Sequence, residues 1–215
     1  IYHGIDLDAL KSEGTCSSQS IRQKLGIKQT DKLIVLSGRL QPWKGQEDFV
    51  AAAAQIAQSI PDVYFCLVGA ALFGMSGDFP GKIQTLVKHH KLEKKLFMVG
   101  FQENGVDWLR AADICVNASR EPETFGLVVV EAMALGKPVV VASGGAPAEI
   151  ITHGENGLLF KPGDVLGLIS NITTLLADSE YAKKLGDAAW RRIHASFSAS
   201  HMCAEVGNFI EETLQ

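Results

Sequence analysis

The sequence predicts an α/β protein with a Rossmann-like, doubly wound parallel sheet. Short, nearly continuous apolar runs alternate with helical patterns from residue 32 onward, which is typical of parallel strands covered by helices on both faces. A chain of 215 residues is long enough for one α/β domain with a substantial core. Its 47% hydrophobic and 20% charged residues are an ordinary balance for a globular domain.

The elements follow one another in a regular order. The segment IRQKLG predicts a short helix that closes at Gly26, because glycine commonly follows a helix end. Apolar runs predict strands over 33–40, 63–69, 96–101, 114–119, 138–143 and 157–160. Apolar residues at helical spacing predict helices over 46–60, 82–92, 106–112, 126–136, 164–177, 179–195 and 200–214.

These patterns divide the chain into three parts. Residues 1–31 are irregular and polar, and we expect a linker and the start of the domain there. Residues 32–197 carry the Rossmann-like pattern, and residues 198–215 form an amphipathic helix. That helix packs either on this domain or on another domain outside the chain. Because the sequence starts at an isoleucine in the middle of a motif, we expect a preceding domain and an N-terminus that are missing here.

Charge and cysteine usage exclude some classes of protein. A net charge of −4 and a pI near 5.9 argue against a broad surface for nucleic acid or anionic membrane. There is no run of 18 apolar residues to cross a bilayer. Cys66 and Cys115 lie in apolar runs, and none of the four cysteines forms a CxxC pair. We therefore expect buried thiols rather than disulfides, and a cytoplasmic protein.

A basic loop follows the first predicted strand. In a doubly wound sheet the ligand lies beyond the carboxyl ends of the strands. Arg39 and Lys44 occupy the first of these loops, and Gly38 and Gly45 beside them allow close approach of a ligand to the backbone. A planar guanidinium and a compact ammonium group suit a diphosphate. The alternative is a solvated loop with incidental charges.

A helix start and acidic residues follow the fourth predicted strand. The helix begins at about Gly126, and its free N–H groups suit an anion. Glu121, Glu123 and Glu131 lie nearby. Glu131 falls inside the apolar run LVVVEAMAL, about 7–8 Å along the axis from the helix start. At that distance it suits the ribose of a nucleotide whose phosphates lie at the helix tip. The alternative is a glutamate that faces solvent.

Other motifs point to different chemistry but lack the required context. Asp6-Leu7-Asp8 is a D-x-D pattern of the kind that binds a metal–nucleotide complex, but it does not follow a strand inside the domain. The segment from Gly77 to Ile83 is one residue short of a P-loop and has no Ser or Thr after Lys82. No G-x-G-x-x-G follows a strand, so a nicotinamide site is not indicated.

Several motifs together resemble one family. Glu123 and Glu131 form an E-x7-E pattern similar to the signature of retaining glycosyltransferases of family 4, the glycosyl transferases group 1, which have the two-domain GT-B fold. SGRLQPWKG resembles the family's basic loop, and IYHGID resembles its interdomain segment with His3 in place of Asn. LVGAALFG and VGFQEN are similar to two further segments, with Ala71 and Glu103 in place of Gly. The stretch 131–164 follows the family pattern closely.

The resemblance implies a role for each matching residue. Catalytic roles fall to Arg39 and Lys44, which would hold the diphosphate and stabilise the departing nucleotide, and to Glu123, which would bind the sugar hydroxyls. Glu131 would bind the ribose. The remaining donor-binding residues would contribute mostly backbone contacts to phosphate, sugar and base: Gly38, Gly100, Phe101, Thr124, Phe125, Gly126 and Leu127.

The predicted function is that of the donor-binding domain, the C-terminal half of a GT-B enzyme. It would move a hexose with retention of configuration, without a metal or other cofactor, from a nucleoside-diphosphate sugar such as UDP-glucose. The partners would be the nucleotide sugar and, through the missing domain, a saccharide or lipid-linked acceptor and any peripheral membrane contact. No nucleic acid is expected. We expect this chain alone to be inactive. A GT-B sugar-nucleotide epimerase and a noncatalytic nucleotide-sugar-binding module remain alternatives.

Overall fold

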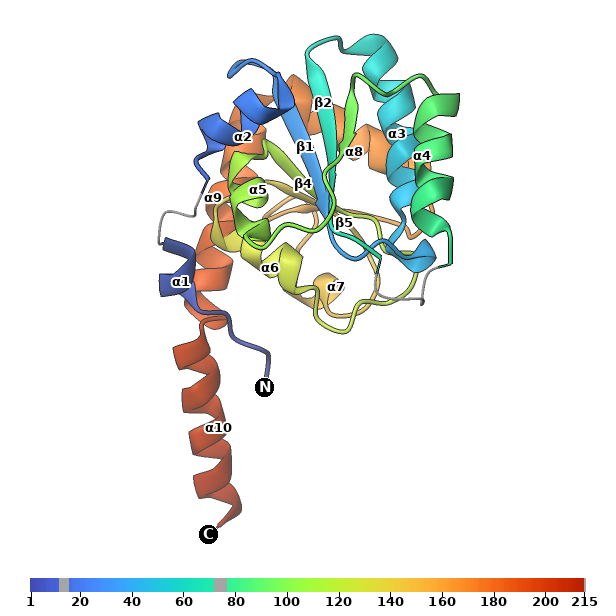
Figure 1. Ribbon diagram of the computed structural model, residues 1–215. Helices are drawn as coiled ribbons and strands as arrows, with labels where there is room; N and C mark the ends of the chain where they lie inside the picture. Colours follow the sequence, from blue (N-terminus) through green and yellow to red (C-terminus); the bar gives the residue numbers. More distant parts are fainter. Residues whose placement is uncertain (12–15, 72–76, 215) are drawn as a thin grey trace.

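The fold is a single parallel sheet with helices on both faces (Figure 1). The computed structural model describes residues 1–11, 16–71 and 77–214. The strand order β3-β2-β1-β4-β5-β6 means that the chain moves outward from β1 and then returns to its other side at β4. The carboxyl ends of β1 and β4 therefore flank the switch point where such sheets bind ligands. The strands are β1 (Lys32–Ser37), β2 (Val63–Val68), β3 (Leu96–Met98), β4 (Ile114–Asn117), β5 (Val139–Ala142) and β6 (Leu158–Phe160).

Two hydrophobic cores lie on opposite faces of the sheet. In β1, Ile34 and Leu36 belong to one core while Leu33 and Val35 belong to the other. The strand is apolar throughout because side chains alternate between two buried faces. On one side pack α3 (Gln46–Ser59), α4 (Phe79–His89) and α8 (Val165–Ala177). On the other pack α2 (Ser18–Leu25), α5 (Gly105–Ala111), α6 (Leu127–Ala134) and α9 (Ser179–Ser196).

The fold class is confirmed, but several element bounds differ from the predictions. The first strand ends at Ser37 rather than at residue 40, although the backbone N–H groups of Gly38 and Leu40 still donate to the carbonyl oxygens of Val68 and Ala70, at 2.9 and 3.0 Å. The helix predicted over 82–92 begins at Phe79, with Pro80 in its first turn, where proline is tolerated. Part of the glycine-rich loop before it, residues 72–76, lies outside the described residues. The short elements α1 (Leu7–Lys11), η1 (Pro42–Lys44) and α7 (Pro147–Ile150) were not predicted.

The two ends of the chain lie beside each other. Helix α10 (Ala199–Thr213) projects from the body, and its described residues include none that is buried (Figure 1). The N-terminal segment runs along the junction of α9 and α10, where Ile5 pairs with Ser198. Residues 12–15 of the predicted linker lie outside the described residues. The division of the chain at residues 31 and 197 stays a prediction.

The cysteines confirm part of the expected pattern. Cys66 and Cys115 are buried in strands, and burial raises the pKa of each thiol to about 12. Cys16 and Cys203 are exposed, contrary to a core position, and all four are free thiols. In the described part of the chain, no helix is long and apolar enough to cross a membrane.

Candidate functional site

A partly buried ion pair joins the two loops that sequence reasoning singled out. The Lys44 ammonium group, after β1, contacts Oε1 of Glu123, after β4. Oε1 of Glu123 also accepts hydrogen bonds from Ser119 Oγ at 2.6 Å and Asn117 Nδ2 at 3.1 Å. Burial alone would raise the pKa of Glu123, but these hydrogen bonds outweigh burial and hold the pKa below its ordinary value. Glu123 is thus a charged carboxylate with its cation already in contact.

Backbone packing fixes the position of Lys44. Gly45 has φ +71°, and a Cβ atom there would lie 1.8 Å from the carbonyl oxygen of Ala118. Glycine is needed because the loop after β1 passes directly over the end of β4. The buried amide of Gln46 donates to the Arg39 carbonyl oxygen at 2.8 Å and secures the other end of the loop.

A second ion pair supports the loop from outside. Arg120 contacts both carboxylate oxygens of Asp48, at 2.8 and 2.6 Å, and its backbone N–H donates to the Trp43 carbonyl oxygen at 2.7 Å. Asp48 is buried at the start of α3. Sequence reasoning missed Asn117, Ser119, Arg120 and Asp48. A signal existed for Asp48, because a carboxylate on the apolar side of a helix requires a partner.

The start of α6 faces the same cavity. Gly126 caps this helix with φ +78°, and the segment before it is held by Glu123, whose backbone carbonyl accepts from Ala146 N at 3.1 Å. The N–H groups of Leu127 and Val128 at its first two positions have no acceptor within the helix and present a partial positive charge, while Val129 N donates to the Gly126 carbonyl oxygen at 2.8 Å. A cavity of about 380 Å³ lies in front of them. Its lining holds most of the predicted residues: Gly38, Arg39, Lys44, Glu123, Thr124, Phe125, Gly126 and Leu127, together with His3, Ser37, Asn117 and Val128.

Two further cavities continue from this one along the strand ends. An apolar cavity of about 500 Å³ shares Gly38 and Arg39 with the first and is lined by Phe101, whose side chain is 76% exposed. Gly100 lies in a smaller adjoining cavity of about 210 Å³, beside Gly69. An apolar cavity next to a cationic one has the composition that a nucleotide base and its phosphates require.

Glu131 lies apart from the ion pair. It lines a cavity of about 370 Å³ with Asn104 and Gly105, and Gly105 also lines the apolar cavity. Burial raises the pKa of Glu131. The structure therefore brings Arg39, Lys44, Glu123 and the start of α6 into one cavity, and it places Glu131 and Gly100 in neighbouring ones. Glu131 is partly buried and lines an open cavity.

Comparison with known proteins identifies the family. Residues 17–192 match the family described as glycosyl transferases group 1. This chain belongs to that family. It is 28% identical over 195 residues to N-acetyl-alpha-D-glucosaminyl L-malate synthase of Bacillus anthracis, a match that covers 91% of this chain and 49% of that protein. The chain thus spans about half the length of the curated relatives it matches.

Two solved structures share the fold of this chain. Anabaena Alr3699/HepE in complex with UDP superposes with a TM-score of 0.90 and is 31% identical, covering 99% of this chain and 57% of that chain. The C-terminal domain of the group 1 protein LpcC from Francisella tularensis gives a TM-score of 0.78 at 28% identity. That match covers 91% of this chain and 100% of the LpcC domain. The predicted GT-B relationship is confirmed.

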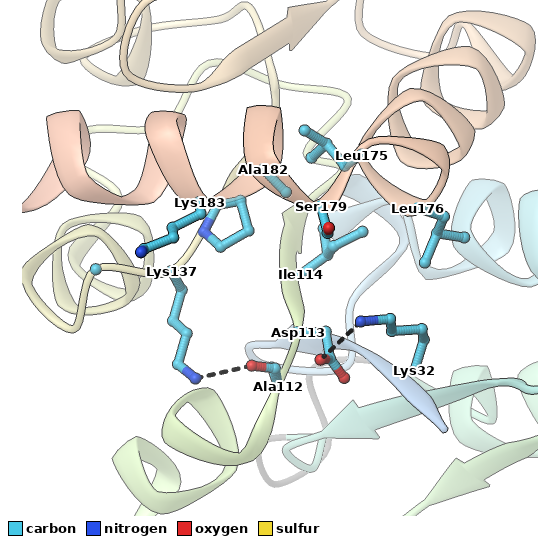
Figure 2. A pocket seen from close by; sticks show the side chains of 12 residues that line it. Lys32, Ala112, Asp113, Ile114, Lys137, Leu175, Leu176, Ser179, Ala182 and Lys183 are labelled. Carbon is cyan, nitrogen blue, oxygen red and sulfur yellow. Dashed lines mark hydrogen bonds and ion pairs between the residues drawn. The ribbon is translucent and has the colours of Figure 1, made fainter. Parts of the chain in front are cut away.

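A further cavity of this glycosyl transferase domain, of about 250 Å³, lies at the amino ends of the strands (Figure 2). Lys32, Lys137 and Lys183 line it. Lys137 donates to the Ala112 carbonyl oxygen at 2.9 Å, and Lys32 lies 3.8 Å from Asp113 (Figure 2). Burial lowers the pKa of Lys137. Lys137 and Lys32 thus already have partners. The cavity lies at the amino ends of the strands, opposite the carboxyl ends that flank the switch point.

The described residues contain no group of three or more His, Cys, Asp or Glu side chains placed to hold a metal ion. Asp6 of the D-x-D pattern acts as a cap of α1, because its Oδ1 atom accepts from the backbone N–H groups of Asp8 and Ala9, each at 3.0 Å. The segment that resembles a P-loop runs into α4, where Lys82 pairs with Glu47.

Proposed function

We propose that this chain is the donor-binding half of a retaining, metal-independent glycosyltransferase that takes a hexose from a nucleoside-diphosphate sugar, of which UDP-glucose is the representative. The observation that carries the proposal is the Lys44–Glu123 ion pair beside Arg39 and the start of α6. Cations and free N–H groups converge on one cavity there, with a carboxylate beside them. The complexes of HepE with UDP and UDP-glucose favour UDP as the nucleotide.

Each residue has a role that follows from its position. Arg39, Lys44 and the N–H groups at the start of α6 hold the diphosphate and stabilise the charge that develops when the glycosyl–phosphate bond breaks. Because these groups are fixed in advance, the leaving group needs no Mg²⁺. Glu123 accepts hydrogen bonds from hydroxyls of the sugar and orients it. The acceptor hydroxyl bonds to the anomeric carbon on the same face of the sugar from which the phosphate departs, and that phosphate takes up the hydroxyl proton. Retention of configuration therefore requires no nucleophile of the protein.

Three remaining contacts complete the donor site. Glu131 binds the ribose hydroxyls at the far side of Gly105, and the base lies against Phe101 and Gly100 in the apolar cavity. The acceptor, a saccharide or lipid-linked sugar, is held by a second domain that is not part of this chain. Such an enzyme works in the cytoplasm, where nucleotide sugars and reduced thiols occur together. This chain by itself binds the donor but transfers no sugar.

A binding panel tests this function. UDP, GDP, ADP and their hexose conjugates are titrated into the chain by calorimetry. We expect UDP and UDP-glucose to bind, and addition of the second domain to release UDP from the donor when an acceptor is present. Formation of an epimer of the sugar would instead indicate an epimerase. Donor binding without any nucleotide release by the full-length protein would indicate a sensor. Absence of binding by every nucleotide would refute the proposal.

Substitution of the two glutamates should separate the parts of the donor. Glu131→Ala removes a contact with ribose, which UDP and UDP-glucose share, so the affinity for both should fall about tenfold. Glu123→Gln keeps a hydrogen-bonding side chain beside Lys44 but loses the charge that orients the sugar. This variant should lower the affinity for UDP-glucose about tenfold and change the affinity for UDP by less than about threefold.

Isothermal titration with both ligands measures the difference, and Glu93→Ala, at an exposed glutamate, is the control. A Glu123→Gln variant that loses UDP and UDP-glucose equally would contradict the sugar-binding role.

A further inference from the structure

His3 reaches the donor cavity from a distant part of the sequence. The backbone two residues later is fixed by two hydrogen bonds at the α9–α10 junction: Ile5 N donates to the Phe197 carbonyl oxygen and Ala199 N donates to the Ile5 carbonyl oxygen, each at 2.9 Å. A Cβ atom at Gly4 would lie 2.4 Å from the carbonyl oxygen of Ser198. Close packing here leaves His3 directed toward the cavity in front of α6.

An aromatic contact holds the imidazole next to the start of α6. The rings of His3 and Phe125 meet edge to face, with centroids 5.3 Å apart. Phe125 is buried, and its ring centroid lies 6.4 Å from that of Phe197. Phe125 directly precedes Gly126, the cap of the helix. His3 therefore lines the same cavity as Arg39 and Lys44, at the end where the helix presents its free N–H groups.

The charges in this cavity leave a role for another cation. Each phosphate of a nucleoside-diphosphate sugar is a diester with one negative charge. Lys44 is already paired with Glu123, so their formal charges cancel. Arg39 and the partial charge at the start of α6, equivalent to roughly half an elementary charge, are the other groups that favour an anion there. These two contributions sum to roughly 1.5 positive charges against two negative ones, so the diphosphate is not fully neutralised, and a cationic His3 would make the cavity net positive toward it.

We infer that His3 is a further donor-binding residue, whose protonated imidazolium pairs with the diphosphate and makes donor affinity depend on pH. This inference rests on the proposed function. Histidine changes charge between pH 5 and 8, and an anionic ligand favours its charged form. Binding of the donor should therefore take up protons, and acidification should tighten binding. The charged groups around the His3 segment are Arg39, Lys44 and Glu123 in the cavity, Glu149 bonded to Tyr2, and Arg192 over Phe197.

Nucleotide sugars are suitable probes because both of their phosphates are diesters and keep their charge between pH 5.5 and 8. UDP-glucose, GDP-mannose and ADP-glucose are titrated into the chain, and the tightest binder is followed across this range. The wild type should bind it about three- to tenfold more tightly at pH 5.5 than the His3→Asn variant, with equal affinities at pH 8. Asparagine keeps a hydrogen-bond donor but cannot become charged. The control is His90→Asn, at an exposed histidine after α4.

Proton uptake provides a second readout that a purely structural role would not change. Titrations near pH 6.5 in buffers of different ionisation enthalpy should show more protons bound by the wild type and His90→Asn than by His3→Asn. Equal pH dependence and equal proton uptake in His3→Asn and wild type would overturn the inference and leave the proposed function intact. Failure of all three nucleotide sugars to bind at any pH would overturn both.

Discussion

The Gly45→Ala variant is expected to lose about 2–5 kcal/mol of unfolding free energy. Alanine is disfavoured at φ +71° by about 1–2 kcal/mol, and its Cβ atom would lie 1.8 Å from the Ala118 carbonyl oxygen, so the loop after β1 must move away from β4. This displacement carries Lys44 away from Glu123. Donor affinity should fall by at least about tenfold even under conditions where the variant remains folded.

A matched glycine separates backbone strain from the close contact. Gly26 has φ +69°, but no atom lies within 4 Å of the position its Cβ would take. Gly26→Ala should therefore cost only about 1–2 kcal/mol and leave donor binding unchanged. Urea denaturation followed by circular dichroism measures both variants. Equal losses of stability in the two variants would show that the contact between the loop and β4 is not important.

Lys44→Ala should weaken binding of UDP and UDP-glucose about ten- to a hundredfold. A charge-assisted contact with a diphosphate contributes about 1.5–3 kcal/mol, and the variant also leaves the Glu123 carboxylate in the cavity without its cation. The control is Lys183→Ala, which removes an exposed lysine from the cavity at the opposite end of the sheet (Figure 2). Calorimetry should show the control within about twofold of the wild type. A reversed result would place the diphosphate at the amino ends of the strands.

The Lys44→Ala variant should also show a different pH dependence of its unfolding free energy. The folded-state pKa of Glu123 is lowered in part by Lys44, so this pair adds stability above the unfolded-state pKa and loses it as the pH falls through the folded-state pKa. Lys44→Ala should be less stable than the wild type by about 1–3 kcal/mol at pH 7, and the difference should shrink below about pH 4. A difference that stays constant down to pH 3 would contradict the role of the ion pair.

The sequence predicted the sheet well because its strands are apolar on both faces. The run from Leu33 to Leu36 is unambiguous for that reason, whereas the strand ends were predicted too long, because an apolar pattern does not mark the residue at which regular pairing stops. Arg39, Lys44 and Glu123 were found because polar residues at strand ends stand out after apolar runs. Their roles as donor-binding residues stay predictions.

The interactions between distant residues could not be predicted in this way. Lys44 and Glu123 are 79 positions apart, and only the neighbouring positions of β1 and β4 in the sheet bring them into contact. Ser119 and Asn117 are common residues whose role depends on that geometry. His3 reaches the cavity through contacts of its segment with the last two helices. Such long-range contacts leave no periodic pattern in the sequence.

The central claim is that the cavity between Lys44, Glu123 and the start of α6 holds the diphosphate of a nucleotide sugar without a metal ion. A crystal structure of this chain with UDP-glucose, grown in the presence of EDTA, tests it most directly. The account predicts the phosphates at hydrogen-bond distance from Arg39, Lys44 and the first N–H groups of α6, with the ribose near Glu131. Nucleotide bound instead between Lys32, Lys137 and Lys183, or bound at the predicted cavity only when Mg²⁺ replaces EDTA, would contradict it.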